Sequence, residues 1–132
     1  MRSIFISYAG EDRPTVDAML NWKNQATLDF KLIADRAQPD ISSEAQVKAY
    51  LKSMLDKSNG IIILIGDNTH SKYWVEWEYQ YARNNNLKFA IMRVPKSTGG
   101  TFRVLPSSLK AYNFKLNNLR NIFRDWKWKV NF

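Results

Sequence analysis

Apolar residues occur along the chain in two patterns: short continuous runs, and longer stretches in which they recur every three or four positions. The clearest run is residues 61–65, Ile-Ile-Ile-Leu-Ile, which lies between Gly60 and Gly66. Because none of its positions is polar, this run predicts a strand that is buried on both faces, as at the centre of a parallel sheet.

The other apolar positions predict four more strands and four helices. The strands are expected at residues 3–8, 29–34, 88–94 and 111–114. The helices are expected at about 13–26, from Ser43 to before Asn59, at 72–84 and at about 115–128. Asp12 is expected to cap the first helix, and Ser43 with Gln46 has the spacing of a capping box.

Strands and helices that alternate along a chain indicate a parallel sheet with helices on both faces, joined by right-handed crossovers. The order here predicts an α/β fold of three layers, flavodoxin-like, with a central, mostly parallel, five-stranded sheet. We expect residues 1–132 to form one domain, with the C-terminal helix at about 115–128 packed on it.

Composition narrows the possible chemistry. The chain has no cysteine, which excludes a disulfide framework, a thiolate nucleophile and a Cys-ligated metal. Residues 1–25 lack the apolar segment of a signal peptide, and no stretch approaches the roughly 20 apolar residues of a membrane span. We therefore expect a soluble, cytoplasmic protein that does not contact a membrane.

The net charge of +8 leaves three interpretations open. It is compatible with a solubilising surface, with attraction to a phosphate-bearing ligand or acidic partner, and with binding to nucleic acid. Charge alone does not choose among them.

Several motifs are missing. The chain has neither a GxxxxGK[ST] loop nor a GxGxxG fingerprint after its first strand. His70 is the single histidine, so we expect no metal site and no Ser-His-Asp triad. A phosphoacceptor site of the receiver type would need an acidic pair where Ser7 and Tyr8 stand.

One carboxylate, that of Glu78, is expected to lie beside an aromatic residue. Glu78 lies four residues after Trp74, so the two side chains share a face of the predicted helix 72–84. A glutamate on a helix is usually exposed to solvent, and the residues alone leave that alternative open. Glu76, two residues from Trp74, fits the solvated face better.

Two groups of residues resemble Toll/interleukin-1 receptor (TIR) domains. Residues 5–8, Phe-Ile-Ser-Tyr, followed by Glu11-Asp12, resemble the first conserved box of that family. Residues 60–65, followed by Ser71-x-x-Trp-Val-x-x-Glu78, resemble the third strand and the element that carries the catalytic glutamate in NAD-consuming TIR domains. The chain is most similar to the short bacterial TIR-like proteins of Thoeris anti-phage defence, over residues 2–95.

The resemblance implies an enzyme for which NAD is the substrate, with no cofactor. Glu78 would be the catalytic residue for cleavage of the nicotinamide–ribose bond, and Ser7, Tyr8 and Trp74 would contact the substrate. The product would be ADP-ribose or, as the Thoeris likeness implies, a cyclic ADP-ribose isomer that signals to an effector protein. Self-association on activation is also expected.

The loop after the second strand supplies two more candidates. Several NAD-cleaving TIR domains have basic residues after the Ser-Tyr pair, where this chain has Ala9-Gly10. Arg36, or a residue of a neighbouring subunit, is therefore a candidate for binding the diphosphate. Asp35 lies where such domains often place an acid near the substrate, although a turn-forming role suits it equally well.

Two other functions remain open. Many TIR domains are non-catalytic adaptors that act by self-association. The tail mixes Arg120, Arg124, Lys127 and Lys129 with aromatic residues, as single-strand nucleic-acid binders do. However, Leu116, Leu119, Phe123 and Trp126 have the spacing of a helix face that packs on a core. We therefore favour docking of this helix on the sheet and do not expect nucleic-acid binding.

Overall fold

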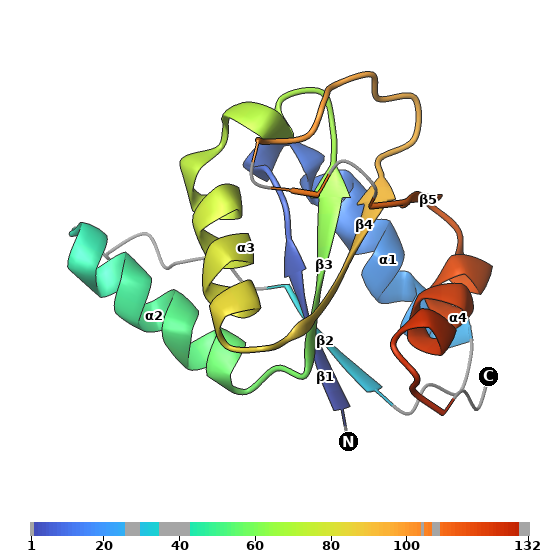
Figure 1. The fold of residues 1–132 in the computed structure, drawn as a ribbon. Coiled ribbons are helices and arrows are strands. Elements are labelled where there is room, and N and C mark those ends of the chain that lie inside the picture. Colours follow the sequence, from blue (N-terminus) through green and yellow to red (C-terminus); the bar gives the residue numbers. More distant parts are fainter. Residues whose placement is uncertain (1, 26–29, 35–42, 104, 107–108, 130–132) are drawn as a thin grey trace.

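The computed structural model describes residues 2–25, 30–34, 43–103, 105–106 and 109–129. Over these residues the apolar runs form a five-stranded sheet in the order β2-β1-β3-β4-β5, and every neighbouring pair is parallel (Figure 1). The strands are β1 (Arg2–Ser7), β2 (Phe30–Ile33), β3 (Gly60–Ile65), β4 (Lys88–Arg93) and β5 (Ala111–Asn113). The predicted α/β fold with a parallel five-stranded sheet is confirmed, and the strand boundaries agree within one residue.

The central strand is buried on both faces, as predicted. Each residue from Ile61 to Ile65 is 0% exposed. Ile61, Ile63 and Ile65 pack in one apolar cluster, and Ile62 and Leu64 pack in the other, because successive side chains of a strand point to opposite faces.

Four α-helices in the described part of the chain cover the two faces of the sheet (Figure 1). They are α1 (Arg13–Gln25), α2 (Glu44–Asp56), α3 (Tyr73–Asn84) and α4 (Leu116–Asp125). The first and last helices bury their apolar residues with one cluster, and α2 and α3 bury theirs with the other. None of the described helices has the length and apolarity that crossing a bilayer requires.

Local sequence determines where α2 begins and where α4 ends. The predicted capping box at α2 is confirmed, since Ser43 Oγ accepts a hydrogen bond from the Gln46 N–H and the Gln46 side chain accepts one from the Ser43 N–H. Helix α4 ends at Asp125 and not near residue 128. Lys127 takes a left-handed φ of 64°, and the Trp128 N–H bonds to the Phe123 carbonyl at 2.8 Å, which is the Schellman pattern.

Two C-terminal aromatic residues, Phe123 and Trp126, are buried. Leu119, Phe123 and Trp126 are buried within the cluster that contains α1, and the Trp126 indole N–H donates to the Phe89 carbonyl at 3.1 Å. Rings packed in this way are not available to stack on bases, so the basic-aromatic pattern of the tail is better explained by docking of the helix.

Asp12 departs from its predicted role. Helix α1 begins directly after it, but among the described residues the carboxylate makes no capping hydrogen bond, and its Oδ2 atom is buried without a partner. The carboxylate packs against Gly66, where a Cβ atom would collide with both of its oxygens. Burial, with Glu11 and Asp67 nearby, raises the pKa of Asp12 above its ordinary value of 3.8, and Lys72 opposes that rise.

Gly60 is predicted to be required for the packing of α4. A Cβ atom at this position would lie 2.6 and 2.8 Å from two ring carbons of the buried Trp126. We expect Gly60→Ala to lower the free energy of unfolding by about 1–3 kcal/mol, the usual cost of overpacking a core. Denaturant unfolding of Gly60→Ala and of Gly100→Ala, whose Cβ would meet nothing within 4 Å, provides the comparison. Equal losses in the two variants would contradict this account.

Asp12 is predicted to destabilise the fold at neutral pH. Because its folded pKa is raised, the folded state holds a proton that the unfolded state has released once the pH exceeds 3.8. Stability therefore falls as the pH rises through the folded pKa, and above that pH the full cost is present. We expect the isosteric Asp12→Asn variant to be more stable than the parent at pH 7, with the difference shrinking in acid. Thermal unfolding of the parent and the variant at pH 7 and at a pH below 3.8 tests this. An Asn variant that is less stable than the parent at pH 7 would refute it.

Candidate active site

The order in which the chain adds strands to the sheet reverses between β1 and β3, and we call this point the chain reversal. From β1 the chain proceeds to β2 on one side, and then returns to β3 on the other side of β1. In open α/β sheets, ligands bind outside the carboxyl ends of the strands at such a reversal. Ser7 ends β1 at this point, with Ile63 of β3 as its register partner.

Glu78 reaches this same point from α3. The buried residues of that helix are Val75, Glu78, Tyr79 and Ala82, so the glutamate occupies a core-facing position among apolar side chains. It is 0% exposed. Ser7, which is also 0% exposed, donates a hydrogen bond from Oγ to Glu78 Oε1 at 2.7 Å. The solvated-face alternative for Glu78 is therefore wrong, and Ser7 contacts the glutamate directly.

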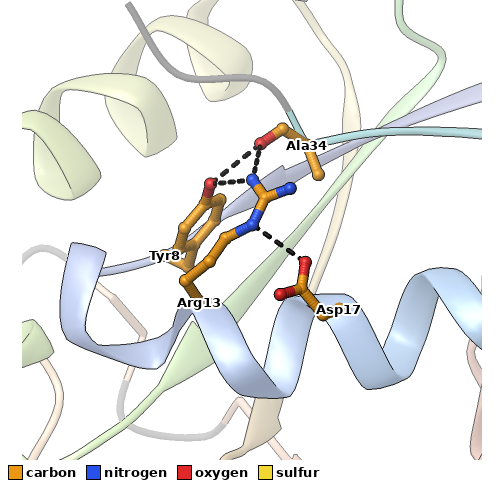
Figure 2. A network of polar contacts seen from close by, with 4 residues as sticks. All are labelled: Tyr8, Arg13, Asp17 and Ala34. Carbon is orange, nitrogen blue, oxygen red and sulfur yellow. Dashed lines mark hydrogen bonds and ion pairs between the residues drawn. The ribbon is translucent and has the colours of Figure 1, made fainter.

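Tyr8 joins three elements through its hydroxyl (Figure 2). The hydroxyl donates to the Ala34 carbonyl at 2.9 Å and accepts a hydrogen bond from Arg13 Nη1 at 2.8 Å. Arg13 in turn donates from Nε to Asp17 at 2.9 Å. This network fixes the end of β1 to the start of α1 and to the residue after β2, and it holds the Tyr8 ring in place.

A pocket of about 270 Å³ opens between the end of β1 and the start of α3, lined by residues 8–10 and 71–75. Tyr8 and Trp74, both predicted to contact substrate, lie in its wall. Glu78 does not line this pocket, but it follows Trp74 by one turn and Val75 by slightly less on the same helix. Part of the pocket wall therefore lies within about one helical turn of the buried carboxylate.

The structure thus brings together four of the six residues predicted for the site: Ser7, Tyr8, Trp74 and Glu78. The other two, Asp35 and Arg36, lie outside the described residues. Two larger hollows, of about 430 and 460 Å³, share Phe89 and Trp126 in their walls and contain none of the predicted site residues. Among the described residues, no group of three or more His, Cys, Asp or Glu side chains could hold a metal ion.

Sequence reasoning missed two charged neighbours of the site. Lys72 lines the pocket, and its Nζ lies 3.6 Å from Glu11 Oε1. Glu11 also accepts a hydrogen bond from the Asn68 side chain at 2.8 Å, so it joins the β1–α1 connection to the β3–α3 connection. Their positions in the sequence could have indicated this, because Glu11 follows β1, Lys72 follows β3, and the carboxyl ends of these two strands lie side by side at the chain reversal.

Solved structures support the fold. The TIR domain of the Toll-related receptor TRR-2 from the lower metazoan Hydra magnipapillata matches with a TM-score of 0.63 and 17% identity, covering 94% of this chain and 97% of that one. TIR domains in the activated Roq1 resistosome, which recognises the pathogen effector XopQ, match with a TM-score of 0.49 and 15% identity over 70% of this chain and 57% of that one. The second likeness is too slight to carry an argument.

Sequence comparison identifies the family. No curated protein matches the chain. The family model described as the TIR-like domain of the Thoeris protein ThsB matches residues 5–99, which is more than two thirds of the chain and includes the end of β1, all of β3 and α3, and the described residues of the candidate site. The chain therefore belongs to the family of TIR-like domains of the Thoeris protein ThsB.

Proposed function

We propose that this protein cleaves the bond between nicotinamide and ribose in NAD, and that Glu78 is the catalytic residue. The observation that carries the proposal is the position of Glu78, a buried carboxylate bonded to Ser7 at the chain reversal and adjoining a pocket with Tyr8 and Trp74 in its wall. Membership of the ThsB family supports it.

The chemistry requires one carboxylate. Breaking the N-glycosidic bond leaves positive charge on the ribose ring, and a carboxylate held beside the ring stabilises that charge. Nicotinamide leaves as a neutral base, so no acid is needed to protonate it. A carboxylate removed from water interacts more strongly with the cation than an exposed one does, because the surrounding dielectric constant is lower.

The other site residues would position the Glu78 carboxylate and the nicotinamide. The Ser7 hydroxyl fixes Oε1 of Glu78 and thereby the direction in which the carboxylate faces. Tyr8 and Trp74 would enclose the nicotinamide, since both residues line the adjoining pocket. Because Glu78 is 0% exposed, the ribose can reach it only after a neighbouring segment moves aside, so the catalytic conformation must differ from this one.

The nucleophile determines the product. Water would give ADP-ribose, whereas attack by another group of the same substrate would give a cyclic ADP-ribose isomer. A site that excludes water favours the second route, and membership of the ThsB family supports it. We propose that this cyclic product is a diffusible signal for an effector protein in the cytoplasm, with self-association of the domain on activation.

One observation favours a non-catalytic adaptor instead. Complete burial and a hydrogen bond to Ser7 are also what a purely structural polar pair would show. In that case the domain would act through self-association, and Glu78 would contribute to stability alone.

Glu78→Gln is predicted to lower the rate of nicotinamide release from NAD by about 100-fold or more, because the neutral amide cannot stabilise the ribose cation. Purified parent and variant are incubated with NAD, and free nicotinamide is measured by chromatography. Glu76→Gln is the matched control, since it makes the same change on the same helix and Glu76 is half-exposed.

Thermal unfolding of both variants separates catalysis from folding. The amide at position 78 can still accept a hydrogen bond from Ser7, so the variant should fold. A folded Glu78→Gln protein that releases nicotinamide as fast as the parent would sink the catalytic assignment. A stable parent that releases none under any condition in which the domain assembles would favour the adaptor.

A further inference from the structure

The pocket beside Glu78 carries one unassigned charge. Among the described residues that line it, Lys72 is the one ionised side chain, and the others are aromatic, small or apolar. We propose that Lys72 binds the diphosphate of NAD and makes the site selective for dinucleotides. This inference rests on the proposed function and adds to it a specificity-determining residue.

Position supports the assignment. Lys72 directly precedes α3, so its backbone lies about 9 Å along the helix axis from Glu78 at a rise of about 1.5 Å per residue. In NAD the diphosphate is joined to the nicotinamide ribose through the 5′ carbon, a few bonds from the scissile bond. A ribose at Glu78 therefore leaves the diphosphate within reach of a lysine on its flexible four-carbon stem.

The pocket is also unfilled at a second position, Gly10. Gly10 lines the same pocket, and a Cβ atom built on it would meet nothing within 4 Å. The backbone at Gly10 thus borders open space and not packed side chains.

The present partner of Lys72 is replaceable. Its Nζ lies 3.6 Å from Glu11 Oε1, and the two side chains are 44% and 43% exposed. An ion pair this open contributes little to stability, so a diphosphate with two negative charges can displace one carboxylate. Glu11 would then repel the bound ligand, and the two residues should affect NAD binding in opposite directions.

The simpler interpretation is that the Lys72–Glu11 pair only ties the β1–α1 connection to the β3–α3 connection. That role predicts that loss of either residue has the same effect. Diphosphate binding predicts effects of opposite sign, which makes the two interpretations separable.

The first experiment compares steady-state kinetics of parent, Lys72→Met, Lys72→Arg and Glu11→Gln on NAD and on nicotinamide riboside, which lacks the diphosphate. We expect Lys72→Met to raise KM for NAD about tenfold or more, the cost of a lost charge-assisted hydrogen bond. Lys72→Arg should restore most of the loss, and Glu11→Gln should lower KM. The change caused by Lys72→Met should be confined to NAD.

Lys48→Met is the matched control. Lys48 is 33% exposed and also forms an open pair, with Glu44 at 3.7 Å, but it lies on α2 and does not line the pocket. It should leave KM for NAD unchanged. An unaltered KM for NAD in Lys72→Met, or an equal rise in Glu11→Gln, would overturn the inference while leaving NAD cleavage intact.

A second readout does not depend on turnover. Calorimetric titration with ADP-ribose, which retains the diphosphate, measures binding to Glu78→Gln with and without Lys72→Met. Binding that weakens about tenfold in the double variant supports Lys72 even if the parent does not cleave NAD, a result that would refute only the proposed function. Equal affinity in the two proteins, or no binding to either, overturns the assignment of Lys72.

Discussion

The architecture depends on a strand that has no exposed side. Every residue from Ile61 to Ile65 is excluded from water, and an isoleucine or leucine side chain contributes about 1.5–3 kcal/mol when fully buried. This burial requires helices on both faces and a strand on each edge of β3. With β1 and β2 on one side and β4 and β5 on the other, the order in which strands are added to the sheet reverses between β1 and β3. Ser7, which ends β1, and Gly66, which follows β3, thereby lie at the carboxyl end of the sheet, the edge at which ligands bind in open α/β folds.

Two acids at this edge occupy positions that an apolar residue would fill at lower cost. Glu78 interrupts the buried stripe of α3 and is bonded to Ser7. Asp12 packs on Gly66 with one oxygen unpartnered among the described residues. Burying carboxylates is unfavourable unless they are paired, so folds that retain them commonly do so for function. Both buried carboxylates of the described residues lie at the chain reversal and neither lies in a strand, which supports the proposal of a reacting site there.

The sequence was sufficient for the arrangement of elements and for part of the site. Short apolar runs located the five strands of the described chain, and helical spacing located its four α-helices. The Trp74–Glu78 spacing placed both residues on one helix face. Contacts that depend on register across the sheet were not accessible, such as the bond between Ser7 and Glu78. The orientation of Asp12 was missed because a capping acid and a buried acid have the same sequence signature. Lys72 was missed because a lysine before a helix is ordinarily solvated. Asp35 and Arg36 stay predictions.

The most direct test of the account is a crystal structure of the Glu78→Gln variant with NAD. We expect the hydroxyls of the nicotinamide ribose to lie within hydrogen-bonding distance of the side chain at position 78, with the nicotinamide between Tyr8 and Trp74. NAD bound with its nicotinamide ribose elsewhere, for example in the hollows beside Trp126, with position 78 still sealed against Ser7, would contradict it.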